Sequence, residues 1–205
     1  KNLNFHGLQI FGIEAADYGF GQMPENFEST LNWCQAQRCQ FVIIPNPLQF
    51  EPTTTAQARQ FVADVQQMAD TAVSKNINIV VKVAHRFETT LLNTLGDAET
   101  FIEQVGRPNV KVELGTFDLQ IEEQDGAGQM GRLGERIAFL RMSDSNQGAI
   151  GEGNMKLGAY LWAIQELEHN PPILLDIKRP YASPFATKGN PKTIQESLQQ
   201  SRSWF

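Results

Sequence analysis

The sequence lacks a long hydrophobic run. No apolar stretch in its 205 residues approaches the roughly 20 residues that a membrane-spanning helix requires, so we expect no membrane span. The apolar run near the N-terminus is too short for a secretory signal peptide. Hydrophobic residues make up 41% and charged residues 20% of the chain, which is typical of a folded globular protein. We therefore expect one domain covering residues 1–205.

Cysteine is scarce, with two residues in the whole chain. Cys34 and Cys39 lie five residues apart on a predicted helix, so we expect their thiols to face different directions. Such a pair suits a reducing compartment better than a disulfide framework, and we expect a cytoplasmic protein.

A basic surface is also missing. Asp and Glu number 23 against 17 Lys and Arg, for a net charge of −6. This balance argues against a polyanion partner, and no RNA-reading motif is present, so we expect no nucleic-acid binding. The three histidines (His6, His85 and His169) lack metal-ligand spacing.

Six apolar, β-branched segments predict strands. They cover residues 8–15, 41–44, 77–83, 110–117, 137–142 and 173–177. Helical periodicity lies between most of them, at about residues 24–37, 55–74, 91–105 and 157–168, with a closing helix at 193–205. Residues 122–131 predict a loop or a short distorted helix. This alternation predicts an α/β fold with a parallel sheet covered by helices.

Three motifs resemble a known family. Residues 82–89 read KVAHRFET, residues 114–123 read LGTFDLQIEE, and residues 142–146 read MSDSN, followed by Gly151-Glu152-Gly153. Together they resemble the sugar-phosphate isomerase/epimerase family of xylose-isomerase-like TIM barrels, which includes the ketose 3-epimerases. The resemblance covers about residues 75–205. It implies a (β/α)₈ barrel in which the six visible strands match strands three to eight.

The resemblance leaves the first two βα units unmatched. A parallel sheet with bare edges exposes unpaired backbone groups. Three explanations stay open: an N-terminal portion missing from this sequence, a reduced barrel, or closure by another chain. We expect closure by a second chain or a second copy of this one.

Members of that family bind one divalent metal at the strand ends through a glutamate, an aspartate, a histidine and a second glutamate. The two glutamates also act as acid and base. By resemblance, those four positions hold Lys82, Gly115, Arg141 and Asp176, and the substrate-contacting histidine is Asp118. The family's ligands carry a charge of −3, whereas these four residues carry +1. Two fixed cations would repel a divalent cation, so we expect no metal and no other cofactor.

Two interpretations of these residues stay open. In the first, Lys82, Asp118, Arg141 and Asp176 form a buried ion-pair cluster that replaces the metal as a structural element. In the second, Lys82 and Arg141 hold the carboxylate or phosphate of a small anionic or sugar ligand. The candidate ligand-binding residues are then Lys82, His85, Arg86, Asp118, Arg141 and Asp176.

Any remaining catalysis would fall to Lys82 as a Schiff-base nucleophile and Asp176 as proton acceptor. We favour a non-catalytic role in binding or assembly. The alternative is an active isomerase or epimerase that acts on a small sugar or sugar phosphate through an altered site.

Two further expectations concern the local structure around single residues. Glu88 should begin a helix, and Asp144 and Asn146 should organise their own loop.

Overall fold

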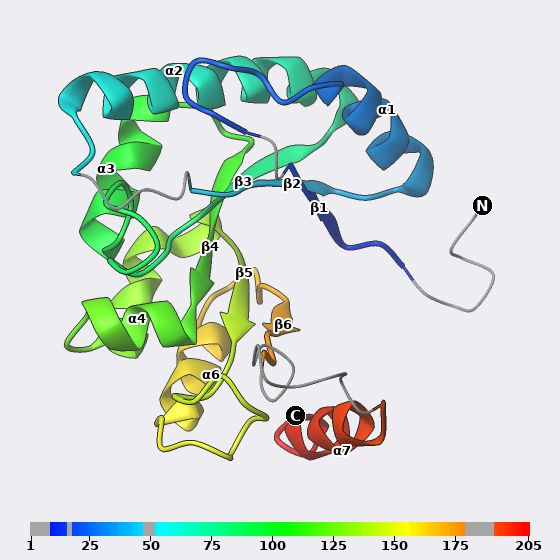
Figure 1. The fold of residues 1–205 in the computed structure, drawn as a ribbon, viewed down its shortest axis with the longest axis vertical. Helices are drawn as coiled ribbons and strands as arrows, with labels where there is room; N and C mark the ends of the chain where they lie inside the picture. The colour runs from blue at the N-terminus through cyan, green and yellow to red at the C-terminus, as the bar shows by residue number, and fades with distance from the viewer. Residues whose placement is uncertain (1–8, 16–17, 47–51, 179–190) are drawn as a thin grey trace. The chain divides into compact units, whose positions relative to one another are not determined.

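The computed structural model describes residues 9–15, 18–46, 52–178 and 191–205. The chain divides into two compact units, Lys1–Glu113 and Leu114–Phe205, which are described in turn (Figure 1). Parts of the sequence lie outside the described residues. They include His6, Leu8 at the start of the predicted strand 8–15, and residues 179–190.

The first unit contains strands that pair in parallel and in sequence order. Its elements are β1 (Gly12–Glu14), α1 (Phe27–Gln37), β2 (Phe41–Ile44), α2 (Thr55–Ala72), the 3₁₀ turn η2 (Val73–Lys75), β3 (Asn78–Lys82), α3 (Leu95–Val105) and β4 (Val110–Gly115), of which the first four residues belong to this unit. Parallel neighbours joined through helices are the βαβ arrangement that the sequence predicts.

Helices α1 and α2 lie alongside β1 to β3 on one side of these strands (Figure 1). Helix α2 packs against β3 and α3, and the rings of Phe61 and Phe101 stack with centroids 5.2 Å apart. Phe61 and Met68 of α2 are fully buried, as is Val80 of β3. Removing a side chain of this size from water contributes about 1.5–3 kcal/mol, so the apolar stripe of α2 holds the unit together.

Helix α3 begins later than its apolar periodicity predicts. Leu91 and Leu92 precede the helix, which starts at Leu95. Thr94 accepts a hydrogen bond from the Asp97 N–H, and the Asp97 side chain accepts one from the Thr94 N–H, which completes a capping box. This cap satisfies backbone donors that would otherwise be orphaned, so it fixes the start of the helix.

The cysteine prediction is wrong in its geometry. Helix α1 ends at Gln37, and Arg38 adopts a left-handed conformation with φ of 59°. Cys39 therefore lies beyond the helix, and its N–H donates to the carbonyl of Cys34 at 2.8 Å. The two thiols lie together, and both are buried.

A buried carboxylate ties the loop after β1 to α2. Asp64 accepts hydrogen bonds from the Tyr18 hydroxyl at 2.7 Å, the Gly21 N–H at 2.8 Å and the Gln60 amide at 2.7 Å. Burial, together with the bond to this carboxylate, raises the pKa of Tyr18 far above its usual value. Since all three donors are satisfied within the fold, this network is structural.

The second unit begins with the last two residues of β4. Its elements are α4 (Thr116–Glu122), α5 (Gly126–Gln129), η3 (Met130–Arg136), β5 (Ile137–Met142), α6 (Leu157–Gln165), β6 (Ile173–Leu175) and α7 (Pro191–Arg202). Strands β5 and β6 are parallel, with Leu140 opposite Ile173. Strand β4 ends at Gly115, two residues before its predicted end, because α4 begins at Thr116.

Both units thus alternate strand and helix with parallel pairing, which confirms the predicted α/β class. Each predicted strand is found, and most are shorter than predicted. Within the described ranges, no helix is both long enough and apolar enough to cross a membrane.

Candidate functional site

Lys82, which the motif resemblance matches to the family's first glutamate, is the last residue of β3. Its Nζ donates a hydrogen bond to Glu88 Oε2 at 2.5 Å. The two side chains are 17% and 27% exposed, so the pair is largely shielded from water. Glu88 lies in a turn over residues 86–88, which corrects the expectation that it begins a helix. The lysine is therefore neutralised by an acid six residues later in the same unit.

His85 lies beside this pair and is buried. Its Nδ1 accepts a hydrogen bond from the Phe87 N–H at 3.3 Å, and its Nε2 lies 3.5 Å from the second oxygen of Glu88. An Nδ1 that accepts leaves the imidazole proton on Nε2, facing the carboxylate. Arg86 follows in the same turn with an exposed side chain. The structure thus brings Lys82 and His85 together through Glu88.

Asn46 belongs to this site and was not predicted. It follows β2, and its side-chain amide donates to the carbonyls of Lys82 at 2.7 Å and Leu92 at 3.3 Å. Those bonds fix the backbone at the carboxyl end of β3. The sequence signal for it was its place directly after a buried strand, where parallel α/β folds carry their functional groups.

The second unit holds the other candidates. Arg141 of β5 donates from Nη2 to Asp118 Oδ2 at 2.9 Å, and its Nε lies 3.6 Å from Asp176 Oδ2. Lys178 Nζ lies 3.8 Å from that same oxygen. The Arg141 and Asp118 side chains are only 16% and 6% exposed, so this pair is largely shielded from water. The structure brings Asp118, Arg141 and Asp176 together within the second unit, whereas Lys82, the fourth residue of the expected cluster, pairs with Glu88 in the first unit.

Gly115, which the motif resemblance matches to the family's metal-binding aspartate, leaves room for this ion pair. A Cβ at residue 115 would collide with the Asp118 carboxylate and lie 3.3 Å from Arg141 Nη2. Residues 115 and 118 are therefore sterically linked, because the carboxylate of Asp118 occupies the space that a side chain at 115 would need.

Asp144 organises the loop after β5, as predicted. Its carboxylate accepts from the N–H groups of Ser145 at 2.7 Å, Gly151 at 2.9 Å and Met155 at 3.1 Å. Burial alone would raise the pKa of Asp144, but these backbone bonds outweigh burial and lower it below its usual value. Asn146 accepts from the Gly148 N–H at 2.8 Å in the same loop.

Comparison with known proteins identifies the family to which the chain belongs. The model of the xylose isomerase-like TIM barrel family matches residues 14–204. The chain belongs to the xylose isomerase-like TIM barrel family. Over 125 residues it is 30% identical to an L-ribulose 3-epimerase from Methylomonas sp. strain DH-1, a match that covers 61% of this chain and 44% of that protein. The chain thus spans less than half the length of this curated relative.

Solved structures agree on the fold. A structure of L-ribulose 3-epimerase matches with a TM-score of 0.74 at 22% identity. The match covers 96% of this chain and 67% of the epimerase chain. The D-psicose 3-epimerase of Clostridium cellulolyticum H10, solved with D-tagatose, has a TM-score of 0.75 at 19% identity, covering 96% of this chain and 78% of its own. At these identities the likeness establishes the TIM-barrel fold of the xylose isomerase-like family and nothing further.

The residues present do not fit the divalent metal of that family. Such a metal takes oxygen and imidazole donors, whereas an ammonium and a guanidinium offer no lone pair. Lys82 and Arg141 instead donate to carboxylates. Within the part of the chain that the structure describes, no group of three or more His, Cys, Asp or Glu side chains could hold a metal ion.

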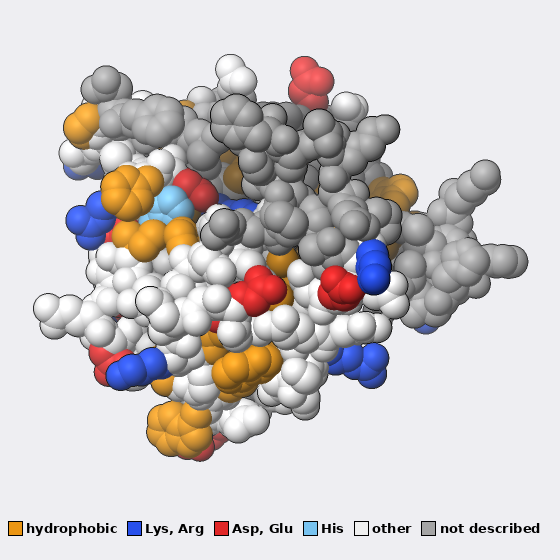
Figure 2. All heavy atoms as spheres, turned by 60° about the horizontal axis from the view of Figure 1, so that its bottom comes forward, with side chains coloured by type: hydrophobic (Ala, Val, Ile, Leu, Met, Phe, Trp, Pro, Cys, Tyr) orange, Lys and Arg blue, Asp and Glu red, His pale blue; other side chains and the backbone are white. Residues whose placement is uncertain are grey.

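Charges of both signs are mixed on the surface. On the face shown in Figure 2, the coloured Lys and Arg side chains are scattered among Asp and Glu side chains. A nucleic-acid surface instead gathers basic residues on one face. The expectation of no nucleic-acid partner stays a prediction.

Proposed function

We propose that this chain is a non-catalytic member of the family, in which ion pairs have taken over the structural role of the metal. One observation supports this proposal: each cation at a former ligand position is held by carboxylates of its own unit, Lys82 by Glu88 and Arg141 by Asp118 and Asp176. Loss of one partner of such a pair leaves a shielded charge without its counter-ion, so we expect removal of either partner to destabilise the unit.

The charge balance favours the structural interpretation over an anion site. In the second unit, Arg141 and Lys178 carry +2 and Asp118 and Asp176 carry −2, so these four sum to zero. In the first unit, Lys82 pairs with Glu88, and Glu113, which lies opposite Lys82 in the register of β3 and β4, is a further buried carboxylate. A small anion would have to compete with carboxylates already in place, which lowers its affinity. Of the two non-catalytic roles, we therefore favour assembly with another chain over binding of an anion.

The Schiff-base hypothesis gains no support from this arrangement. A lysine that attacks a carbonyl must be uncharged, whereas the amine of Lys82 donates to a carboxylate. Asp176, the proposed proton acceptor, lies with Arg141 and Lys178 in the second unit.

Metal content and sugar turnover test the proposal. We expect purified protein, incubated with Mn²⁺ and then desalted, to carry no stoichiometric metal by elemental analysis. We also expect no interconversion of ketoses differing at carbon 3, such as D-fructose and D-psicose, by chromatography. The D-psicose 3-epimerase from Agrobacterium fabrum, run in parallel, is the positive control. Turnover that stops on addition of a chelator would contradict the proposal and support the alternative of an active epimerase.

Assembly is tested separately. Within the described residues, β1 pairs with β2 only, and an unpaired strand edge is a template for another strand. We therefore expect light scattering after size-exclusion chromatography to give a multiple of the 23.0 kDa chain mass. A monomer at every concentration tested would contradict closure by a second copy.

A further inference from the structure

The C-terminus of α1 brings the two cysteines of the chain together. Arg38 adopts a left-handed conformation, its N–H donates to the Gln35 carbonyl at 3.2 Å, and the Cys39 N–H donates to the Cys34 carbonyl at 2.8 Å. These two bonds define a Schellman motif, which packs the residue after the left-handed position against the helix residue five before it. Those two residues are Cys39 and Cys34.

The thiols are buried and differ in chemistry. Cys34 is fully buried and Cys39 is 3% exposed. The Cys34 thiol donates a hydrogen bond to the Cys39 sulfur, which lowers the pKa of Cys39 to about 6 and raises that of Cys34. While protonated, the Cys39 thiol donates to the carbonyls of Phe41 at 3.4 Å and Phe11 at 3.6 Å. Once that proton is lost, Cys39 is the nucleophile and Cys34 is the neighbouring thiol.

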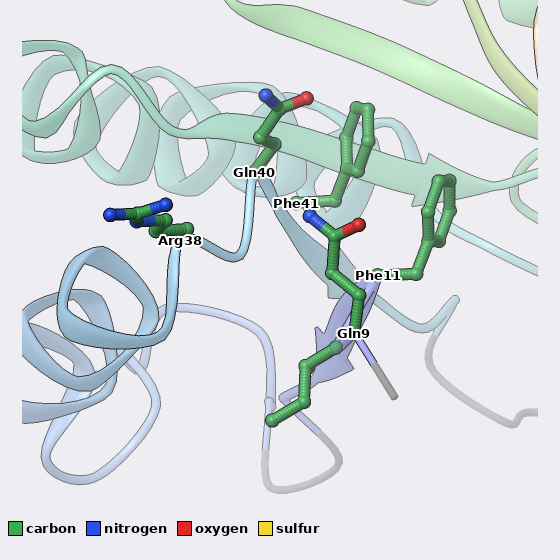
Figure 3. A pocket seen from close by; sticks show the side chains of 6 residues that line it. Gln9, Phe11, Arg38, Gln40 and Phe41 are labelled. Carbon is green, nitrogen blue, oxygen red and sulfur yellow. The ribbon is translucent and has the colours of Figure 1, made fainter. Parts of the chain in front are cut away.

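A pocket lies next to the segment that carries Cys39. The pocket has a volume of about 250 Å³ and is lined by Gln9, Ile10, Phe11, Arg38, Gln40 and Phe41. Figure 3 shows Arg38 extending from the turn after α1, with Gln40 and Phe41 at the start of β2 and Gln9 and Phe11 before β1. Cys39 lies between two lining residues in sequence, and its sulfur is close to the carbonyls of two others.

We propose that Cys34 and Cys39 form a reversible intramolecular disulfide when the protein meets hydrogen peroxide. The Cys39 thiolate attacks one peroxide oxygen, the O–O bond breaks, and the departing hydroxide takes up a proton to become water. The sulfur of Cys34 then attacks the sulfenic sulfur of Cys39. An S–S bond forms, the S–O bond breaks, and the second hydroxide leaves as water with the proton of Cys34. Two thiols lose two electrons, and one peroxide becomes two waters.

The test uses the full chain, first reduced and then treated with hydrogen peroxide at neutral pH. We expect both thiols to disappear together in a titration of the denatured protein, and the intact mass to fall by that of two hydrogen atoms. Peptide mapping should place the bond between Cys34 and Cys39, and dithiothreitol should reverse it. The rate should rise with pH through the range where Cys39 loses its proton. Two titratable thiols after peroxide treatment, or a bond between two chains, would overturn the proposal.

Two matched variants separate the roles of the thiols. Cys34→Ser leaves Cys39 without its partner, so oxidation should stop at a sulfenic acid that dimedone traps. Cys39→Ser removes the nucleophile and should slow oxidation of the remaining thiol at least tenfold. Equal peroxide reactivity of the two variants would contradict the assigned roles. If neither variant folds, the mass and peptide map of the unmodified chain still decide the proposal.

Discussion

Replacing Asp118 with asparagine is expected to lower the free energy of unfolding by about 3 kcal/mol, because it removes the closer of the two carboxylates that compensate the charge of Arg141. Arg141 donates to Asp118 at 2.9 Å, and the Asp118 side chain is only 6% exposed. Asp176, at 3.6 Å from Arg141 Nε, is too distant to replace that bond in full. Urea unfolding monitored by circular dichroism at neutral pH measures the change.

Two further variants make this result specific. Adding Arg141→Met to Asp118→Asn removes the uncompensated guanidinium, so the double variant should recover most of the lost stability. Glu196→Gln removes the acid of an exposed pair with Lys192 whose side chains are 82% and 60% exposed, and should change stability little. A double variant less stable than Asp118→Asn would show that the buried charge is not the cause.

Replacing Asp144 with asparagine is expected to cost about 3 kcal/mol at neutral pH, since hydrogen bonds to a charged acceptor contribute roughly 1.5–3 kcal/mol each. The carboxylate accepts from the backbone of Ser145, Gly151 and Met155. An asparagine of the same shape cannot accept from all of them and turns an N–H₂ group toward backbone donors. Urea unfolding of both proteins at several pH values measures the loss.

The pH dependence of this loss follows from the lowered pKa of Asp144. A carboxyl group with a depressed folded-state pKa contributes stability above its unfolded pKa, and that contribution disappears as pH falls through the folded value. The difference in free energy of unfolding between the unmodified chain and Asp144→Asn should therefore be largest at neutral pH and vanish in strong acid. Asp125→Asn is the control, because Asp125 caps α5 from an exposed position and asparagine caps as well as aspartate. A difference that stays constant down to strong acid would show that the charge of Asp144 does not matter.

The sequence predicted the positions of the strands well because buried parallel strands are short, continuous apolar runs. It placed the ends of helices less well, since local caps compete with periodicity. Leu91 and Leu92 fit the helical pattern of α3, but the capping box at Thr94 starts the helix at Leu95. Similarly, the left-handed turn at Arg38 removes Cys39 from α1, which no hydrophobic period reveals.

At the candidate site, the motif resemblance indicated which side chains differ from the family pattern but not how they pair. The bond between Lys82 and Glu88 depends on a turn at residues 86–88, whereas the motif alone suggested the start of a helix. The pair of Arg141 with Asp118 joins residues 23 apart, so it depends on the tertiary fold. Asn46 acts through backbone carbonyls of Lys82 and Leu92, which a search for charged residues overlooks.

The absence of a side chain at Gly115 also limits which residues this position accepts. An aspartate at 115 would place its side chain against the carboxylate of Asp118 and set two like charges against each other. A larger residue at 115 therefore requires the side chain at 118 to move or to become smaller, so the two positions constrain each other.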